Sequence, residues 1–123
     1  MTTGPPDQQK AIDECRSPNV TEHRLLELLA DPRMMVRANA IFALAKREPE
    51  EEENVVDAIA SIAHSGTATR KVIGTLNERM LAAFGLAKIG SPLAQKRFEE
   101  LRAEMSETEQ QDLDWNVENN DLG

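Results

Sequence analysis

The stretch RANAIFALAK at residues 37–46 returns as RMLAAFGLAK at residues 79–88, 42 residues further along the chain. Arg, Ala, Phe, Leu, Ala and Lys stand at the same six places in both copies. Self-similarity at a period of this size is typical of stacked helical repeats. Such folds mostly present surfaces to partners and rarely carry chemistry. The duplication therefore predicts a repeat architecture and favours a binding role.

The composition of the 123-residue chain favours an all-helical protein. Apolar residues make up 40% of the chain, but aromatic residues only 3%, and Tyr is absent. Small aliphatic residues pack helices closely, whereas strand-forming residues are sparse. A chain of this length can bury one modest core. The sequence predicts an all-α fold of about six helices in antiparallel pairs, with no sheet.

The charge of the chain argues against nucleic-acid binding. The net charge is −8, whereas a phosphate backbone demands clustered Lys and Arg. Acidic residues gather at residues 48–53 and from Glu99 onward. Such runs are usually solvated helix starts or disordered tails. Attraction of a basic partner through these charges is the less favoured interpretation.

Cysteine usage and hydropathy indicate the compartment. Cys15 is the only cysteine, so an internal disulfide and a secreted disulfide scaffold are excluded. The N-terminal residues lack the basic region and apolar run of a signal peptide. No apolar stretch approaches the ~18 residues that a membrane-spanning helix needs. We therefore expect a cytoplasmic protein without membrane association.

Turn and cap signals divide the chain. Thr21 and Ser91 are expected N-caps and Gly90 an expected C-cap. Asp31 is also expected to be an N-cap, because a Pro follows it. From these signals we expect a leader and short capping helix in 1–20, a repeat domain in 21–105, and an acidic, partly disordered tail in 106–123 with a short final helix over 108–115.

The two repeat units differ in the linker between their helices. The first helices align at an offset of 30 and the second helices at an offset of 42, so the second linker is 12 residues longer. Val72 and Ile73 are expected to form an extra short turn in this insertion. Arg70 and Lys71 beside them could hold an anion, although a plain surface insertion is favoured.

The pattern Val36-Arg37-x-x-Ala40-x-x-x-Leu44 resembles HEAT repeats. The resemblance covers roughly residues 21–105, and the Gly-Ser-Pro turn at 90–92 is similar to the turns that join bacterial HEAT-like units. It implies a short right-handed α-solenoid of antiparallel helix pairs, whose second helices line a concave surface. HEAT repeats serve many unrelated roles, so the resemblance bears on fold and not on function.

The resemblance also implies a contact. In the family, an Asp in the turn lies six residues before an Arg of the second helix, and the two often bond each other or adjacent repeats. Asp31 and Arg37 have this spacing. The second copy keeps Arg79, but Ile73 stands at the place of the Asp.

Helical periodicity separates a buried face from an outer one. At about 100° per residue, Val36, Arg37, Ala40, Ile41 and Leu44 fall within one arc, which we expect to be buried. Residues on the opposite arc of both copies, with the basic pair of the insertion, are the expected partner-binding residues: Met35, Asn39, Phe42, Lys46, Arg70, Lys71, Leu81, Phe84 and Lys88. The alternative places both Phe rings between neighbouring repeats as core, and it is slightly favoured because aromatic residues at helical spacing are usually packed.

Chemistry is not indicated by any motif. His23 and His64 lack the spacing of a metal site, and no Gly-rich loop follows a strand. We therefore expect no cofactor and a non-catalytic module that binds another protein, as an adaptor, assembly factor or inhibitor, with homo-oligomerisation as an option. Three alternatives stay open: a HEAT-like lyase; a DNA glycosylase, with which the acidic charge conflicts; and an acidic mimic of DNA.

Overall fold

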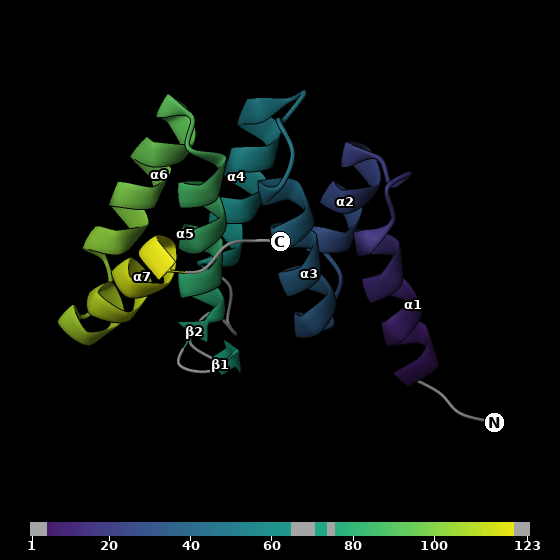
Figure 1. Ribbon diagram of the computed structural model, residues 1–123, viewed down its shortest axis with the longest axis horizontal. Coiled ribbons are helices and arrows are strands. Elements are labelled where there is room, and N and C mark those ends of the chain that lie inside the picture. Colours follow the sequence, from purple (N-terminus) through teal and green to yellow (C-terminus); the bar gives the residue numbers. More distant parts are fainter. Residues whose placement is uncertain (1–4, 65–70, 74–75, 120–123) are drawn as a thin grey trace.

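The computed structural model describes residues 5–64, 71–73 and 76–119, and most of these residues are helical (Figure 1). The helices in chain order are α1 (Pro5–Arg16), α2 (Glu22–Leu29), α3 (Met34–Ala45), α4 (Glu52–Ile62), α5 (Glu78–Ile89), α6 (Pro92–Ala103) and α7 (Glu107–Asn119). Two short strands, β1 (Lys71–Ile73) and β2 (Leu76–Asn77), pair antiparallel between α4 and α5. The predicted all-α class is confirmed.

The structure differs from the expected element list in two places. β1 and β2 lie where the short turn at Val72 and Ile73 was expected, and these β-branched residues favour an extended chain. α7 is longer than the final helix expected over 108–115. A capping box starts it: the Glu109 N–H donates to Ser106 Oγ (3.2 Å), and the Ser106 N–H donates to Glu109 Oε1 (3.0 Å).

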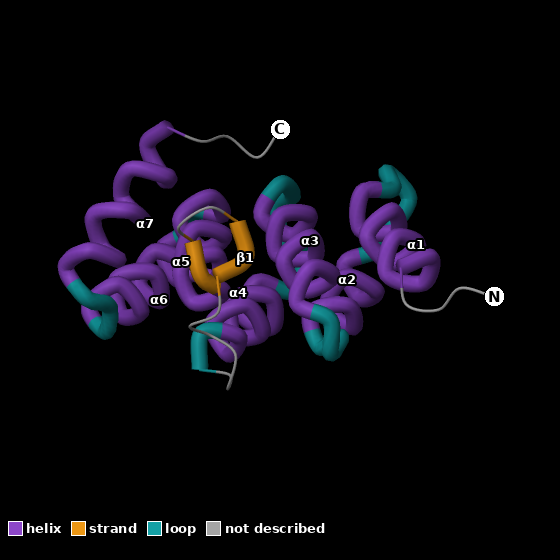
Figure 2. The backbone as a smooth tube through the Cα atoms, turned by 90° about the horizontal axis from the view of Figure 1, so that it is seen from below, coloured by secondary structure: helices purple, strands orange, loops and turns teal. Residues whose placement is uncertain are grey.

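The helices form two rows. α1, α3, α5 and α7 pack against one another in sequence, and α2, α4 and α6 form the second row (Figure 2). Each of α2, α4 and α6 also packs against a helix of the first row that is its neighbour in sequence. α7 differs from the other members of its row, because it crosses α5 obliquely (Figure 1).

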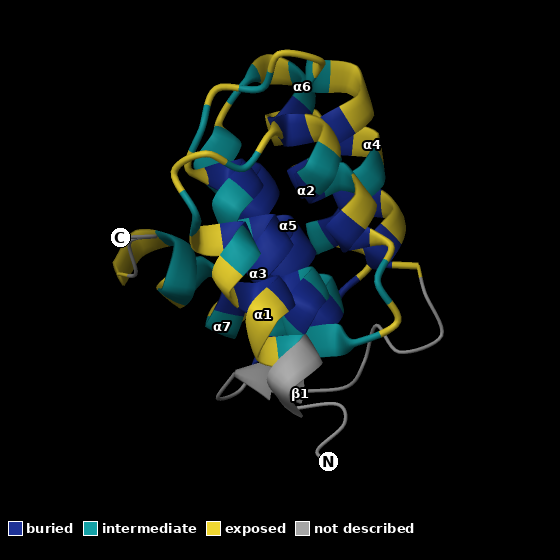
Figure 3. Ribbon diagram, turned by 90° about the vertical axis from the view of Figure 1, so that its right-hand side faces the viewer, coloured by how far each residue is buried: buried dark blue, intermediate teal, exposed yellow. Residues whose placement is uncertain are grey.

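The core lies between the rows. Seen from the α1 end, buried residues concentrate where α3 and α5 face the other helices, and the outer surfaces are exposed (Figure 3). Val36, Ala40, Ile41 and Leu44 are all buried, and Arg37, the fifth residue of the predicted arc, is partly buried. The predicted inner face of the repeated helix is therefore confirmed.

Three of the predicted caps are confirmed. Thr21 Oγ1 accepts from the Arg24 N–H (3.1 Å), and Ser91 Oγ accepts from the Ala94 N–H (3.2 Å). Gly90 ends α5 with a φ of 70°, a left-handed conformation in which a Cβ is disfavoured.

The prediction that Asp31 is an N-cap is wrong. Arg33 is the N-cap of α3 and gives it no side-chain bond. The Asp31 carboxylate instead accepts the Arg33 N–H (2.8 Å) and pairs with the Arg33 guanidinium (3.0 Å). This Asx-type turn satisfies the carboxylate before the helix begins, so Pro32 lies in the turn and not in the first helical position.

Arg37 joins α3 to two other segments. Its Nη1 donates to the carbonyl of Asp31 (2.8 Å), so the expected contact runs through the backbone. Its Nε and Nη2 bind the Glu78 carboxylate at the start of α5 (2.6 and 2.9 Å). In the second copy, Arg79 binds Glu109 of α7 (3.1 Å). Each copy of the repeated Arg thus ties its helix to the next helix of the same row.

Gly85 marks a close approach of α5 to α3. A Cβ at this position would lie 2.6 Å from Ile41 Cγ2, and a β-branched side chain has little freedom to move aside. We expect Gly85→Ala to destabilise the protein by about 1–2 kcal/mol, because overpacking outweighs the gain in helix propensity. Urea unfolding measures the effect. A variant more stable than the native protein would show that α3 can move away without cost.

Candidate binding groove

A groove lies on the described surface between the C-terminal ends of α1 and α3. Its volume is about 450 Å³. We call it the α1–α3 groove. The residues that line it come from both helices and from the segments that follow them: Cys15, Arg16, Ser17, Val20, Asn39, Phe42, Ala43, Lys46 and Arg47.

Local sequence explains why the groove forms at this place. Ser17 ends α1, and its side chain and carbonyl accept the N–H groups of Asn19 (3.2 Å) and Val20 (3.3 Å). The chain thereby turns directly after α1. Arg47, just past α3, donates through Nη2 to the carbonyl of Val20 (3.0 Å). This bond fixes the end of α3 to the loop after α1 and closes one side of the groove.

The electrostatics of the groove oppose those of the whole chain. Three of its lining residues, Arg16, Lys46 and Arg47, are basic, and none is acidic. The Arg16 and Lys46 side chains form no ion pair with any residue in the described part of the chain. Both stand at helix C-termini, where the helix dipole stabilises positive charge. The groove is thus a basic site on a chain with a net charge of −8.

An apolar wall lies beside these cations. Cys15 is 3% exposed. Burial, with the nearby Glu14, raises the pKa of its thiol, so the side chain is neutral at pH 7. Phe42 is half-buried, with one side of the ring against the ring of Phe84 in an edge-to-face contact (centroids 6.3 Å apart, 89° between planes). The groove can therefore receive a ligand with both apolar and anionic groups.

Three of the predicted partner-binding residues line the groove: Asn39, Phe42 and Lys46. Lys46 is exposed, whereas Asn39 is buried and its amide donates to the carbonyl of Met35 (2.8 Å). Met35 lies one turn earlier, half-buried, and is not among the lining residues. The first copy of the repeat thus contributes one wall of this site.

The second copy does not form the exposed ridge that the sequence suggested. Leu81 and Phe84 are 0% and 4% exposed, respectively. α7 packs on α5, and its Leu113 is fully buried. For Phe84 the core alternative is therefore correct. Arg70 lies outside the described residues, as does the side chain of Lys71.

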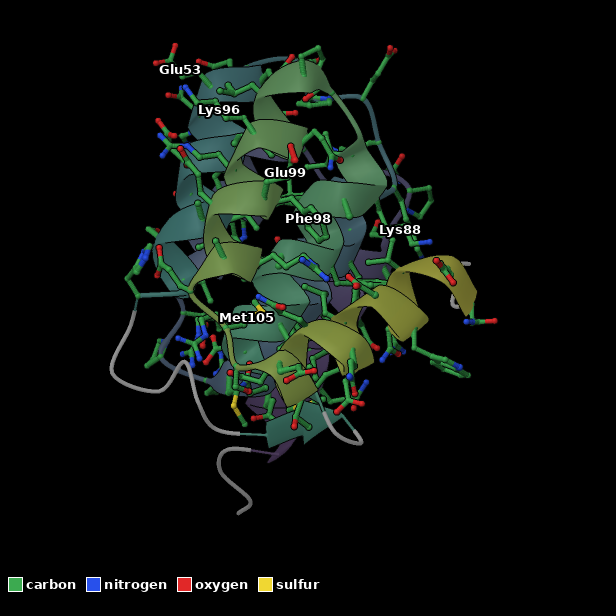
Figure 4. All side chains as sticks on the ribbon, turned by 90° about the vertical axis from the view of Figure 1, so that its left-hand side faces the viewer. Glu53, Lys88, Lys96, Phe98, Glu99 and Met105 are labelled. Atoms are coloured by element: carbon green, nitrogen blue, oxygen red, sulfur yellow. The ribbon has the colours of Figure 1, made fainter. Side chains whose placement is uncertain are left out.

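Lys88 is held beside the end of α7. Its Nζ donates to the carbonyl of Val117 (3.0 Å) and lies 5.4 Å from the Phe84 ring centroid. Figure 4 shows Lys88 next to the C-terminal half of α7. A smaller hollow of about 210 Å³, shared by Lys46, Arg47 and Lys88, adjoins the α1–α3 groove. Glu48 also lines this hollow, so its charge is mixed.

Sequence reasoning missed the half of the groove that α1 contributes. Arg16, Val20 and Arg47 belong to a helix end and two turns outside the repeated pattern. One signal was available in the sequence: a basic residue, Arg16 or Lys46, stands at the end of each of two predicted helices. Which helix ends meet in space, however, is not encoded in that signal.

Glu109 fastens α7 to α5 by charge. The Asn77 amide donates to it at 2.8 Å and the Arg79 guanidinium at 3.1 Å. Burial raises the pKa of Glu109, but hydrogen bonds from the Ser106 N–H, from Asn77 and from Arg79 outweigh burial and lower the pKa from 4.5 to about 2. The carboxylate is therefore ionised at pH 7.

This lowered pKa predicts a pH dependence. The folded-state pKa of Glu109 lies below its unfolded value of 4.5, so the stabilisation is complete above that value and declines as the pH falls towards 2. We expect Glu109→Gln to lower the free energy of unfolding by about 2 kcal/mol at pH 7. Urea unfolding of both proteins between pH 7 and pH 3 should show the difference shrinking below pH 4.5. A difference that stays constant with pH would contradict this account.

Comparisons of the chain with protein-family models, with curated proteins and with solved structures gave no match. Among the residues placed by the structure, no helix is both long and apolar enough to span a bilayer. Within the same residues, no three His, Cys, Asp or Glu side chains converge as metal ligands would.

Proposed function

We propose that the protein is a non-catalytic interaction module of the cytoplasm, with a HEAT-like right-handed α-solenoid, whose α1–α3 groove binds an acidic segment of another protein. The single observation that carries this proposal is the composition of the groove. Arg16, Lys46 and Arg47 line the same groove as the half-buried Phe42, with no acidic residue among the lining, on an otherwise acidic chain. The duplicated helix and the two rows of helices support the repeat architecture.

The chemistry of the groove selects the kind of segment. Carboxylates of a partner would bind the free Arg16 and Lys46 side chains, and opposite charges steer association and suppress wrong partners. An aromatic or aliphatic side chain would pack on Phe42 and the wall formed by Cys15, because buried aromatic and Arg residues usually contribute most of the binding energy. The expected ligand is an acidic segment with one large apolar anchor.

A matched pair of peptides tests this proposal. One is a fluorescein-labelled peptide with a Trp between Glu residues, and the other has Lys in place of each Glu. Fluorescence anisotropy should show binding of the acidic peptide only. Lys46→Glu should weaken it at least about tenfold, the size of effect found for interface charges. Lys96→Glu is the control, because Lys96 is exposed on α6 (Figure 4).

Two outcomes would contradict the proposal. One is equal weakening by Lys46→Glu and Lys96→Glu, which would mean that only net charge matters. The other is equal binding of both peptides. Phe42→Ala and Phe84→Ala separate packing from binding when affinity and melting temperature are measured on the same proteins. Phe42→Ala should weaken peptide binding, whereas Phe84→Ala should lower the melting temperature more.

A further inference from the structure

The outward face of α7 carries an exposed aromatic side chain between two acids. Trp115 is 60% exposed, and among the described residues it is the only large apolar side chain that is exposed. Asp112 and Glu118 lie three residues before and after it, on the same side of the helix. In the part of the chain that the structure covers, neither carboxylate has an ion-pair partner.

This face complements the α1–α3 groove of the same protein. The groove presents unpaired Arg16 and Lys46 beside Phe42, and α7 presents Asp112 and Glu118 beside Trp115. A groove of about 450 Å³ has room for an indole ring. We propose that the occupant of the groove is the Trp115 face of a second copy of this chain. The inference rests on the proposed function, because it names the ligand of the same groove.

The arrangement of the helices decides what kind of assembly results. The groove lies between α1 and α3, whereas Trp115 lies on α7, beyond α5 in the row (Figure 2). The two surfaces differ, so the contact is head-to-tail, and an open chain of any length keeps one free groove at one end and one free Trp115 at the other. Contacts of this type generate open chains unless a ring closes.

The contact is expected to be weak. One helix face in one groove covers less than the ~1,200 Å² of a stable interface, and two copies that each carry a net charge of −8 repel each other. Association should therefore depend on protein concentration over roughly 10 µM to 1 mM, the range of weak complexes.

Sedimentation velocity and Trp fluorescence over this range test the inference. Trp115 is the only Trp, so its emission should move to shorter wavelength as the native protein associates. Trp115→Ala, which empties the outward face, and Lys46→Glu, which blocks the groove, should each remain monomeric. Lys96→Glu should associate as the native protein does.

A mixture of the two blocked variants gives the sharpest result. The Trp115→Ala copy keeps an intact groove, and the Lys46→Glu copy keeps its Trp115. Mixed in equal amounts, the two variants should form dimers of one copy of each. No larger species should form, because neither partner of such a dimer has a second working surface. The inference would be overturned if the mixture contained only monomers. It would also be overturned if the Trp115→Ala variant associated as strongly as the native protein does. If the native protein stays monomeric while the acidic peptide still binds through Lys46, only the inference fails. If the peptide does not bind either, the proposed function fails with it.

Discussion

Replacing Arg37 by Ala is expected to destabilise the protein by about 3–5 kcal/mol, as the loss of one partner of a buried ion pair does. Glu78 is fully buried and Arg37 is 13% exposed in its side chain, with 2.6 Å between Arg37 Nε and Glu78 Oε2. Without the guanidinium, the carboxylate would stay out of contact with water and without its cation. The carbonyl of Asp31 would lose a donor as well. Urea unfolding at pH 7 measures the change.

Two further variants show whether the buried charge is the cause. The double variant Arg37→Met with Glu78→Met should recover most of the stability, because apolar residues of similar volume often replace a buried pair without loss. Arg24→Ala is a matched control, since Arg24 pairs with Glu14 at the surface (2.6 Å). It should unfold close to the native midpoint. A double variant no more stable than Arg37→Ala would assign the loss to packing and not to charge.

Leu86→Ala is expected to lower the free energy of unfolding by about 2–5 kcal/mol, as truncations of buried leucines do. Leu86 is 0% exposed, and Leu44 at the same place of the first copy is 1% exposed. Both belong to the buried core, where truncation leaves a cavity that the surrounding side chains fill only in part. Leu44→Ala should therefore lower the free energy of unfolding by a similar amount. Thermal melts of the two variants compare the effects.

Leu93→Ala provides the reference for these truncations. Leu93 lies at the start of α6 and is half-buried. Truncating its side chain therefore removes less buried apolar surface than truncating Leu44 or Leu86 does, and the loss of stability is smaller. It should shift the melting temperature less than either core variant. Melts unchanged by both Leu44→Ala and Leu86→Ala would mean that the inner and outer faces of the repeated helix are reversed.

The repeated pattern predicted the inner face of α3 and α5 because burial there depends on periodicity alone. Phe42 and Phe84 share one place in the pattern, and yet only Phe84 is fully packed. The difference comes from α7, which covers α5 but not α3. The Ser106 and Glu109 capping box could have predicted the start of α7. No local signal says on which helix it packs.

The groove shows a second limit of sequence reasoning. Phe42 and Lys46 were predicted from the outer arc of the repeat, whereas Arg16 and Val20 come from a turn with no periodic pattern. Ser17 fixes that turn through its own hydrogen bonds, and the turn brings Val20 to the side of the groove that Arg47 closes. Likewise, Asp31 had the right spacing to Arg37, but Arg33 was nearer to its carboxylate. Competition between local partners decided that contact.

The oblique helix α7 also determines which surface lies beyond α5 in its row. Its buried side meets α5 with Leu113 and the carboxylate of Glu109, while its other side is polar apart from Trp115. Within the described residues it therefore completes the bonding of the second repeated Arg and presents a mostly polar side beyond α5. A chain shortened at residue 106 would uncover the side of α5 that packs against α7 and lose solubility.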